Sequence, residues 1–187
     1  WLGSKKPPRV ISVLDYPGEH CQDDRNLIRA ANDVFAEAEG LVAHFGENFD
    51  RPYLDAKFIQ AGLPPIPNMR LTDTCLVARK KFALSSNRLA NLAQFLGCEN
   101  QKMEKGKGWP EWWMGALRGD RKSIQSMVPY CAQDVNTLSD VLKKMLPIIP
   151  TRFLPVNNSI GYDIWTCSGC EGHHFNRHGY YFSEKKR

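Results

Sequence analysis

The chain has 187 residues, 42% of them hydrophobic and 24% charged, which is the composition of an ordinary globular protein. No stretch approaches the ~18 consecutive apolar residues of a membrane-spanning helix, so we expect no membrane partner. The formal net charge is +5. This basic excess fits a polyanionic partner such as a nucleic acid, although it does not require one.

The first half of the chain alternates between predicted strands and helices. β-branched residues indicate the strands, and apolar residues at helical spacing indicate the helices. In chain order the predicted elements are a strand over 9–14, a helix over 24–39, a strand over 41–45, a helix over 52–61, a strand over 70–74 and a helix over 75–82.

The second half is predicted to be helical. A helix capped by Ser85 or Ser86 closes at Gly97, a short helix covers 110–117, and a longer helical stretch covers 120–144, where Pro129 is expected to start a new helix. A strand–helix–strand–helix opening followed by helices predicts an α/β layered core.

The distribution of the cysteines suggests a cellular compartment. The chain has six cysteines, and Cys21, Cys75, Cys98 and Cys131 are dispersed without a secretory signal ahead of them. This pattern predicts reduced, mostly buried thiols in a cytoplasmic protein, or in the host cytoplasm if the protein is viral.

Asp50 stands where a predicted strand passes into a predicted helix. Aspartate is a favoured helix N-cap, and Arg51 and Pro52 would then fill the first helical positions. A second interpretation needs a partner carboxylate elsewhere in the chain, because Mg²⁺ prefers oxygen ligands.

Asp134 is the candidate partner. It follows Tyr130 by four residues in "YCAQD", and residues at that spacing share one face of a helix. Paired carboxylates can hold two cations about 4 Å apart that stabilise the attacking and leaving oxygens of a phosphodiester. Asp73, at the end of a predicted strand, is a further acid without an assigned ligand role.

These motifs resemble a known family. "NFDRPYL", followed about eighty residues later by "YCAQD", resembles the second and third motifs of the DEDD superfamily of 3′→5′ exonucleases, the DnaQ-like enzymes of ribonuclease H fold, and Y-x-x-x-D is typical of the DEDDy branch. The resemblance implies a mixed sheet flanked by helices. It also implies metal-dependent hydrolysis of single-stranded DNA or 3′ ends, with RNA as the alternative substrate.

The resemblance also assigns residues. It implies that Asp50 and Asp134 hold two Mg²⁺ or Mn²⁺ ions, Asp134 directly and Asp50 directly or through water. Tyr130 would orient the attacking water. The residues it places against nucleic acid are Phe49, Lys80, Lys81 and Asn87.

The sequence departs from the family pattern in two places. Phe45 stands where the pattern A-H-N-G has asparagine, while His44 is expected to be a structural imidazole. The first motif, D-x-E, is absent, and Asp15 and Glu19 lie too close to Asp50 to replace it. We therefore expect the first strands and that motif to precede Trp1, and the 187-residue chain alone to be inactive.

The tail carries a C-x-x-C knuckle at Cys167 and Cys170. It resembles the first half of a zinc ribbon, with a strand over 173–182. Two alternatives are a closed zinc site that uses the nearby histidines and a tail without metal. The expected organisation is an N-terminally incomplete exonuclease-like core over 1–150, a linker over 151–165 and a partial zinc-ribbon-like tail over 166–187.

Three functions remain open at this point. The first is a 3′→5′ exonuclease that uses a two-metal mechanism in the complete protein. The second is a non-catalytic nucleic-acid-binding module that kept the fold without the first-motif carboxylates. In the third, a globular interaction protein, Asp50 is only a helix cap and Asp134 only a surface residue.

Overall fold

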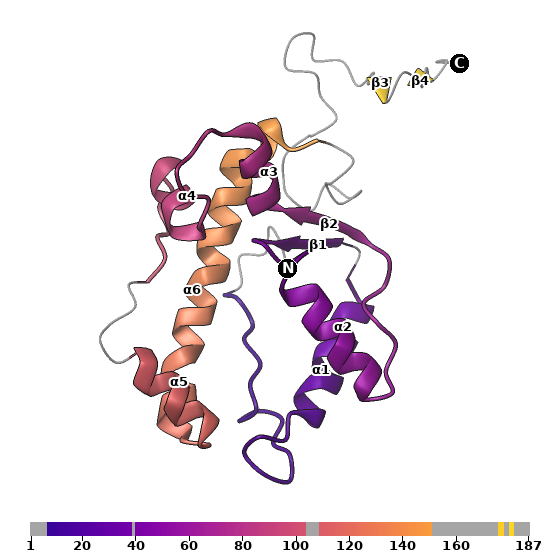
Figure 1. Cartoon of the computed structure of the whole chain (residues 1–187), viewed down its shortest axis with the longest axis vertical. Helices are drawn as coiled ribbons and strands as arrows, with labels where there is room; N and C mark the ends of the chain where they lie inside the picture. The colour runs from indigo at the N-terminus through magenta and orange to yellow at the C-terminus, as the bar shows by residue number, and fades with distance from the viewer. Residues whose placement is uncertain (1–6, 39, 104–108, 151–175, 178–179, 182–187) are drawn as a thin grey trace.

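The structure of the chain is a computed structural model that describes residues 7–38, 40–103, 109–150, 176–177 and 180–181. Figure 1 shows a small sheet with helices around it and one long helix, α6, beside it. The elements are α1 Arg25–Ala36, β1 Gly40–Ala43, α2 Asp50–Gln60, β2 Arg70–Asp73, α3 Thr74–Lys81, α4 Leu89–Phe95, α5 Trp109–Leu117, α6 Arg121–Met145, the 3₁₀ turn η1 Leu146–Ile148, β3 Asn176–Arg177 and β4 Tyr180–Tyr181.

The two central strands are parallel. β1 pairs with β2 in a register that runs from Gly40 opposite Arg70 to Ala43 opposite Asp73. Parallel strands need a crossover connection, and here α2 supplies it. The parallel pair with its helices confirms the predicted α/β class.

Two apolar clusters hold the described part of the chain together. One joins α3, α4 and α6 around Leu92, Leu142 and Met145, which are fully buried. The other joins α1 and α2 around Ile28 and Phe58. The α1–α2 pair and the α3–α4–α6 group therefore each have a core.

The strand predicted over 9–14 is wrong. This segment contains a turn, in which Asp15 N donates to Ser12 O at 3.0 Å. The Asp15 carboxylate accepts from both Ser12 N and Ser12 Oγ at 2.8 Å. β-branched residues favour a strand only when a neighbouring strand pairs with it, and none of the described strands pairs with this segment.

Pro129 does not start a new helix. α6 runs without a break from Arg121 to Met145 with Pro129 inside it, and Asp120 caps its first turn through Ser123 N at 2.8 Å. A proline inside a helix removes one backbone hydrogen bond. Figure 1 shows α5 near one end of α6 and α4 near the other, and packing on both sides of Pro129 compensates for this loss.

The serine cap predicted for α4 is also wrong. α4 begins at Leu89 after Arg88, which gives no side-chain cap. Gly97 does close the helix as predicted, with a left-handed φ of 62°. Of the four dispersed cysteines, Cys75 and Cys98 are buried, whereas the other two are exposed.

The tail differs from the predicted single strand over 173–182. Asn176–Arg177 pairs antiparallel with Tyr180–Tyr181, so the backbone reverses inside that segment. Cys167 and Cys170 lie outside the described residues. None of the helices in the described ranges is long and apolar enough to cross a membrane.

Candidate functional site

Asp73 organises the loop that follows β1. Its buried carboxylate caps α3 by accepting from Cys75 N at 3.0 Å and Leu76 N at 3.2 Å. It also accepts from Phe45 N at 2.9 Å and Glu47 N at 3.2 Å. One side chain thus fixes both the start of α3 and the loop that leads to α2, so its role here is structural.

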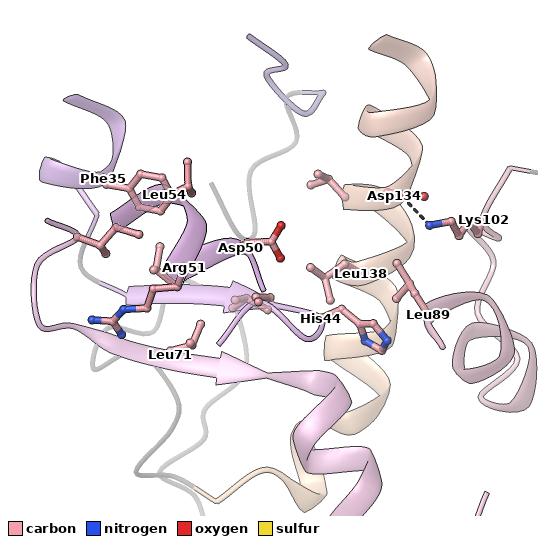
Figure 2. Close-up of a pocket in the computed structure, with 16 residues that line it drawn as sticks. Phe35, His44, Asp50, Arg51, Leu54, Leu71, Leu89, Lys102, Asp134 and Leu138 are labelled. Carbon is pink, nitrogen blue, oxygen red and sulfur yellow. Dashed lines mark hydrogen bonds and ion pairs between the residues drawn. The ribbon is translucent and has the colours of Figure 1, made fainter. Parts of the chain in front are cut away.

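Asp50 is the first residue of α2 and does not cap it. The N-cap position belongs to Phe49, and no side chain caps the helix. The interpretation of Asp50 as a helix cap is therefore wrong, although a negative charge in the first turn still suits the helix dipole. Figure 2 shows the Asp50 carboxylate projecting from the start of α2.

Gly46 makes room beside this carboxylate. A Cβ atom at Gly46 would lie 3.3 Å from Asp50 Oδ2 and only 2.5 Å from the Cβ of Ala43. Because real Cβ atoms do not approach that closely, the loop passes Asp50 in this way only with glycine at position 46.

The two carboxylate oxygens of Asp134 differ in their hydrogen-bond partners. Its Oδ2 accepts from Lys102 Nζ at 2.7 Å, an ion pair that is about a quarter exposed on each side. Its Oδ1 is buried, and no hydrogen-bond donor within the described part of the chain reaches it. A buried carboxylate oxygen without a partner is costly, which makes it a candidate ligand atom.

Lys102 is held as an ammonium at this position. Burial alone would lower the pKa of Lys102, but its hydrogen bonds to Asp134 and Tyr130 outweigh the effect of burial and raise that pKa. The Nζ atom also lies 5.1 Å from the centroid of the Tyr130 ring. The ammonium therefore already balances the charge of the Asp134 carboxylate through its Oδ2 atom.

Tyr130 lies one helical turn before Asp134 on α6 and is 5% exposed. Its ring faces Lys102, and it is not among the residues that line the pocket around Asp50 and Asp134.

Asp50 and Asp134 line one pocket of about 390 Å³. The pocket lies between the two apolar clusters, and its walls include residues of both. Figure 2 shows how these side chains are arranged, with Asp134 turned towards Lys102. The apolar lining residues are Phe35, Leu41, Val42, Ala43, Leu54, Ile66, Leu71, Leu89, Val135 and Leu138, and the others are His44, Gly46, Asp50, Arg51, Lys102 and Asp134.

His44 lines the pocket, but the protein occupies both of its ring nitrogens. Nδ1 lies 2.9 Å from Thr74 Oγ1 and Nε2 lies 2.9 Å from the carbonyl oxygen of Asn87. Burial lowers the pKa of His44, so the ring is neutral at neutral pH. A carbonyl only accepts, so Nε2 donates its proton to Asn87, while the Thr74 hydroxyl donates to the carbonyl oxygen of Ala43 at 3.1 Å. This agrees with the structural imidazole predicted from the sequence.

None of the residues predicted to contact nucleic acid lines this pocket. Phe49 is 68% exposed at the start of α2. Lys80 and Lys81 are exposed in the last turn of α3. Asn87 lies before α4 and lines a second groove, which also contains Phe45 and Arg79.

Lys102 is the site residue that the sequence did not reveal. It lies in a lysine-rich segment that reads as a solvated charge cluster. Its contact with Asp134 spans 32 residues of sequence. Only a helix-face argument that placed this segment against α6 could have found it.

The pocket offers part of a site for a hard cation. Two carboxylates, one of them with a buried oxygen that lacks a donor, have the ligand chemistry that Mg²⁺ or Mn²⁺ prefers. Among the described residues there is no cluster of three or more histidine, cysteine, aspartate or glutamate side chains that could hold a metal. Asp50 and Asp134 line the same pocket, but the Asp134 carboxylate is turned towards Lys102.

Comparison with known proteins gives a family. A family model described as the RNase_H superfamily matches residues 5–146, most of the chain. The comparison with curated proteins and the comparison with solved structures each returned no significant match.

Proposed function

The chain belongs to the RNase H superfamily, and we propose on that basis that its pocket serves metal-dependent 3′→5′ hydrolysis of nucleic acids. The superfamily indicates a nuclease or a related activity on nucleic acid. The observation that carries the finer proposal is the presence of Asp50 and Asp134, from α2 and α6, on the walls of one pocket. The order of motifs around them supports the DnaQ-like, DEDDy type.

Each residue of the site has a role in this proposal. Asp50 and Asp134 would hold Mg²⁺ or Mn²⁺, which supplies charge stabilisation for the reacting phosphate. Lys102 must release Asp134 for the ion to bind, and its ammonium is then free to contact a phosphate oxygen. Tyr130 would position the attacking water through its hydroxyl group rather than remove a proton from it.

The substrate proposed is single-stranded DNA or a 3′ end, with RNA as the alternative. Phe49 would stack on a base, while Lys80 and Lys81 would contact phosphates and Asn87 would hydrogen-bond to the strand. These residues come from the residue before α2, the last turn of α3 and the segment before α4. In the tail, Cys167 and Cys170 are proposed as two ligands of a Zn²⁺ ion.

Two carboxylates are too few for efficient two-metal hydrolysis. Mg²⁺ keeps its waters readily, so a site with two protein carboxylates binds it weakly. We therefore propose that the remaining acidic ligands come from a D-x-E segment ahead of Trp1, and that activity requires a polypeptide containing that segment.

The test is a nuclease assay on such an extended polypeptide. With Mg²⁺ or Mn²⁺ it should shorten a 5′-labelled single strand from its 3′ end, and chelator should stop the reaction. Tyr130→Phe should slow it by about tenfold, since only positioning of the water is lost. Intact substrate with every added metal, in a polypeptide that contains D-x-E and is folded, would refute the proposal.

One observation favours a second function. Lys102 already neutralises Asp134 at 2.7 Å. A chain that had lost its catalytic role would retain such a pair as a stable substitute for a metal. The alternative is therefore a non-catalytic nucleic-acid-binding module, for which the same assay gives strand binding without cleavage.

A further inference from the structure

Phe45 has an unusual backbone conformation. Its φ is 67°, the left-handed region, and it is the one residue other than glycine with positive φ among those that the structure describes. A bulky side chain is rare there, because its Cβ crowds the backbone. Asp73 holds the conformation by accepting from Phe45 N. Strain that is maintained in this way points to a use for the side chain it orients.

The Phe45 side chain is presented at a surface groove. Phe45 is 36% exposed as a residue, and the Arg79 guanidinium lies 4.9 Å from the centroid of its ring. A cation over one face of an aromatic ring restrains the ring and leaves its other face available. A large apolar surface next to a cation is the arrangement that a nucleobase and its phosphate require.

The groove has a volume of about 970 Å³, room for more than one nucleotide-sized group. Its cations are Arg79, Arg88 and Lys102, and its polar groups include Asn87. The buried Oδ1 of Asn87 is reached by no donor within residues 7–38, 40–103 and 109–150. An unpaired acceptor in the wall of a groove that also contains an aromatic ring suits the amino group of a base.

The groove adjoins the pocket of Asp50 and Asp134. His44, Leu89 and Lys102 line both cavities. A strand bound in the groove would therefore lead its next phosphate towards Lys102 and Asp134. Among the residues of the groove, only Lys102 and Asn87 already have a role in the proposed function. Lys102 contacts Asp134, and Asn87 is assigned a contact with the strand.

We propose that this groove binds the unpaired nucleotide adjacent to the scissile phosphate, with its base stacked on Phe45 and its phosphate against Arg79 and Arg88. The proposal rests on the proposed function for the identity of the ligand as a nucleic acid. Stacking on Phe45 needs a base whose face is free. The groove therefore selects single strands and rejects the interior of a duplex.

The test measures binding without turnover. The 187-residue chain is titrated, in chelator, into a labelled ten-nucleotide single strand and into the same strand with abasic sites, which keeps every phosphate. The native chain should bind the strand with bases about tenfold more tightly than the abasic strand. A blunt duplex should bind no better than the abasic strand.

Phe45→Asn removes the ring and keeps a residue that tolerates positive φ, so the variant should fold. The affinity of this variant for each strand should equal the affinity of the native chain for the abasic strand. Phe45→Gly is the second variant, because glycine adopts this φ without steric cost. Arg79→Ala should weaken binding of both strands and reduce the salt dependence by about one phosphate contact.

Two matched controls lie away from the groove. The control variants are Phe95→Ala and Arg121→Ala. Phe95 is 59% exposed on α4, and Arg121 is the first residue of α6. Neither substitution should change the affinity for either strand. The proposal is overturned if the native chain binds both strands equally, or if Phe45→Asn keeps the preference for bases. Base-dependent binding through Phe45 together with an inactive extended polypeptide would support the groove and reject the nuclease.

Discussion

Asp134→Asn should abolish metal-dependent hydrolysis by the extended polypeptide, with a loss of at least about a thousandfold, or ~4 kcal/mol in activation free energy. The substitution keeps the size of the side chain and removes its charge. It affects both the oxygen paired with Lys102 and the buried oxygen that no described donor reaches. The rate of release of 3′ nucleotides at saturating Mn²⁺ measures the effect.

Asp140→Asn is the matched control for this variant. Asp140 lies on the same helix and binds Asn100 through backbone and side chain at 3.0 and 2.8 Å, so its replacement also perturbs the segment that leads to Lys102. It lies outside the pocket. Near-native activity of Asp134→Asn, or an equal loss in Asp140→Asn, would refute the role of Asp134 as a metal ligand.

Asp73→Ala should destabilise the folded chain by about 3 kcal/mol, because it removes a charged cap and leaves four backbone N–H groups without their acceptor. The carboxylate is only 4% exposed, so water does not replace it readily. Urea denaturation at neutral pH measures the free energy of unfolding.

Two variants bracket this effect. Asp73→Asn keeps one acceptor oxygen and should lose about half as much. Asp50→Asn, at an exposed residue that caps nothing, should change stability by less than about 0.5 kcal/mol. If Asp73→Ala unfolds at the same urea concentration as the native chain, the loop is held by other contacts.

The elements that the sequence predicted well are those with a local signal. Apolar spacing located α1 and α6, and the alternation of β1, α2 and β2 identified the class. The prediction of a strand over 9–14 was wrong because β-branched residues favour a strand only when a neighbouring strand pairs with them. The prediction that Pro129 starts a new helix was wrong because tertiary packing along α6 outweighs the loss of one hydrogen bond.

The motifs led to Asp50 and Asp134, whose role as metal ligands stays a prediction. The spacing of "NFD" and "YCAQD" pointed to Asp50 and Asp134, and the structure places both in one pocket. Lys102 was not predictable, because its partner is distant in sequence. The sequence showed that Phe45 replaces the asparagine of the family pattern. Its left-handed backbone and its ring contact with Arg79 depend on the tertiary structure and could not be predicted.

Binding of Mn²⁺ to the 187-residue chain tests most directly whether Asp50 and Asp134 form one cation site. Titration followed by electron paramagnetic resonance should show one ion bound weakly, with a dissociation constant on the order of 1 mM. Binding should be lost in Asp50→Asn and in Asp134→Asn. It should tighten in Lys102→Ala, because the competing ammonium is removed from Asp134. Binding that is unchanged in both aspartate variants would contradict the account.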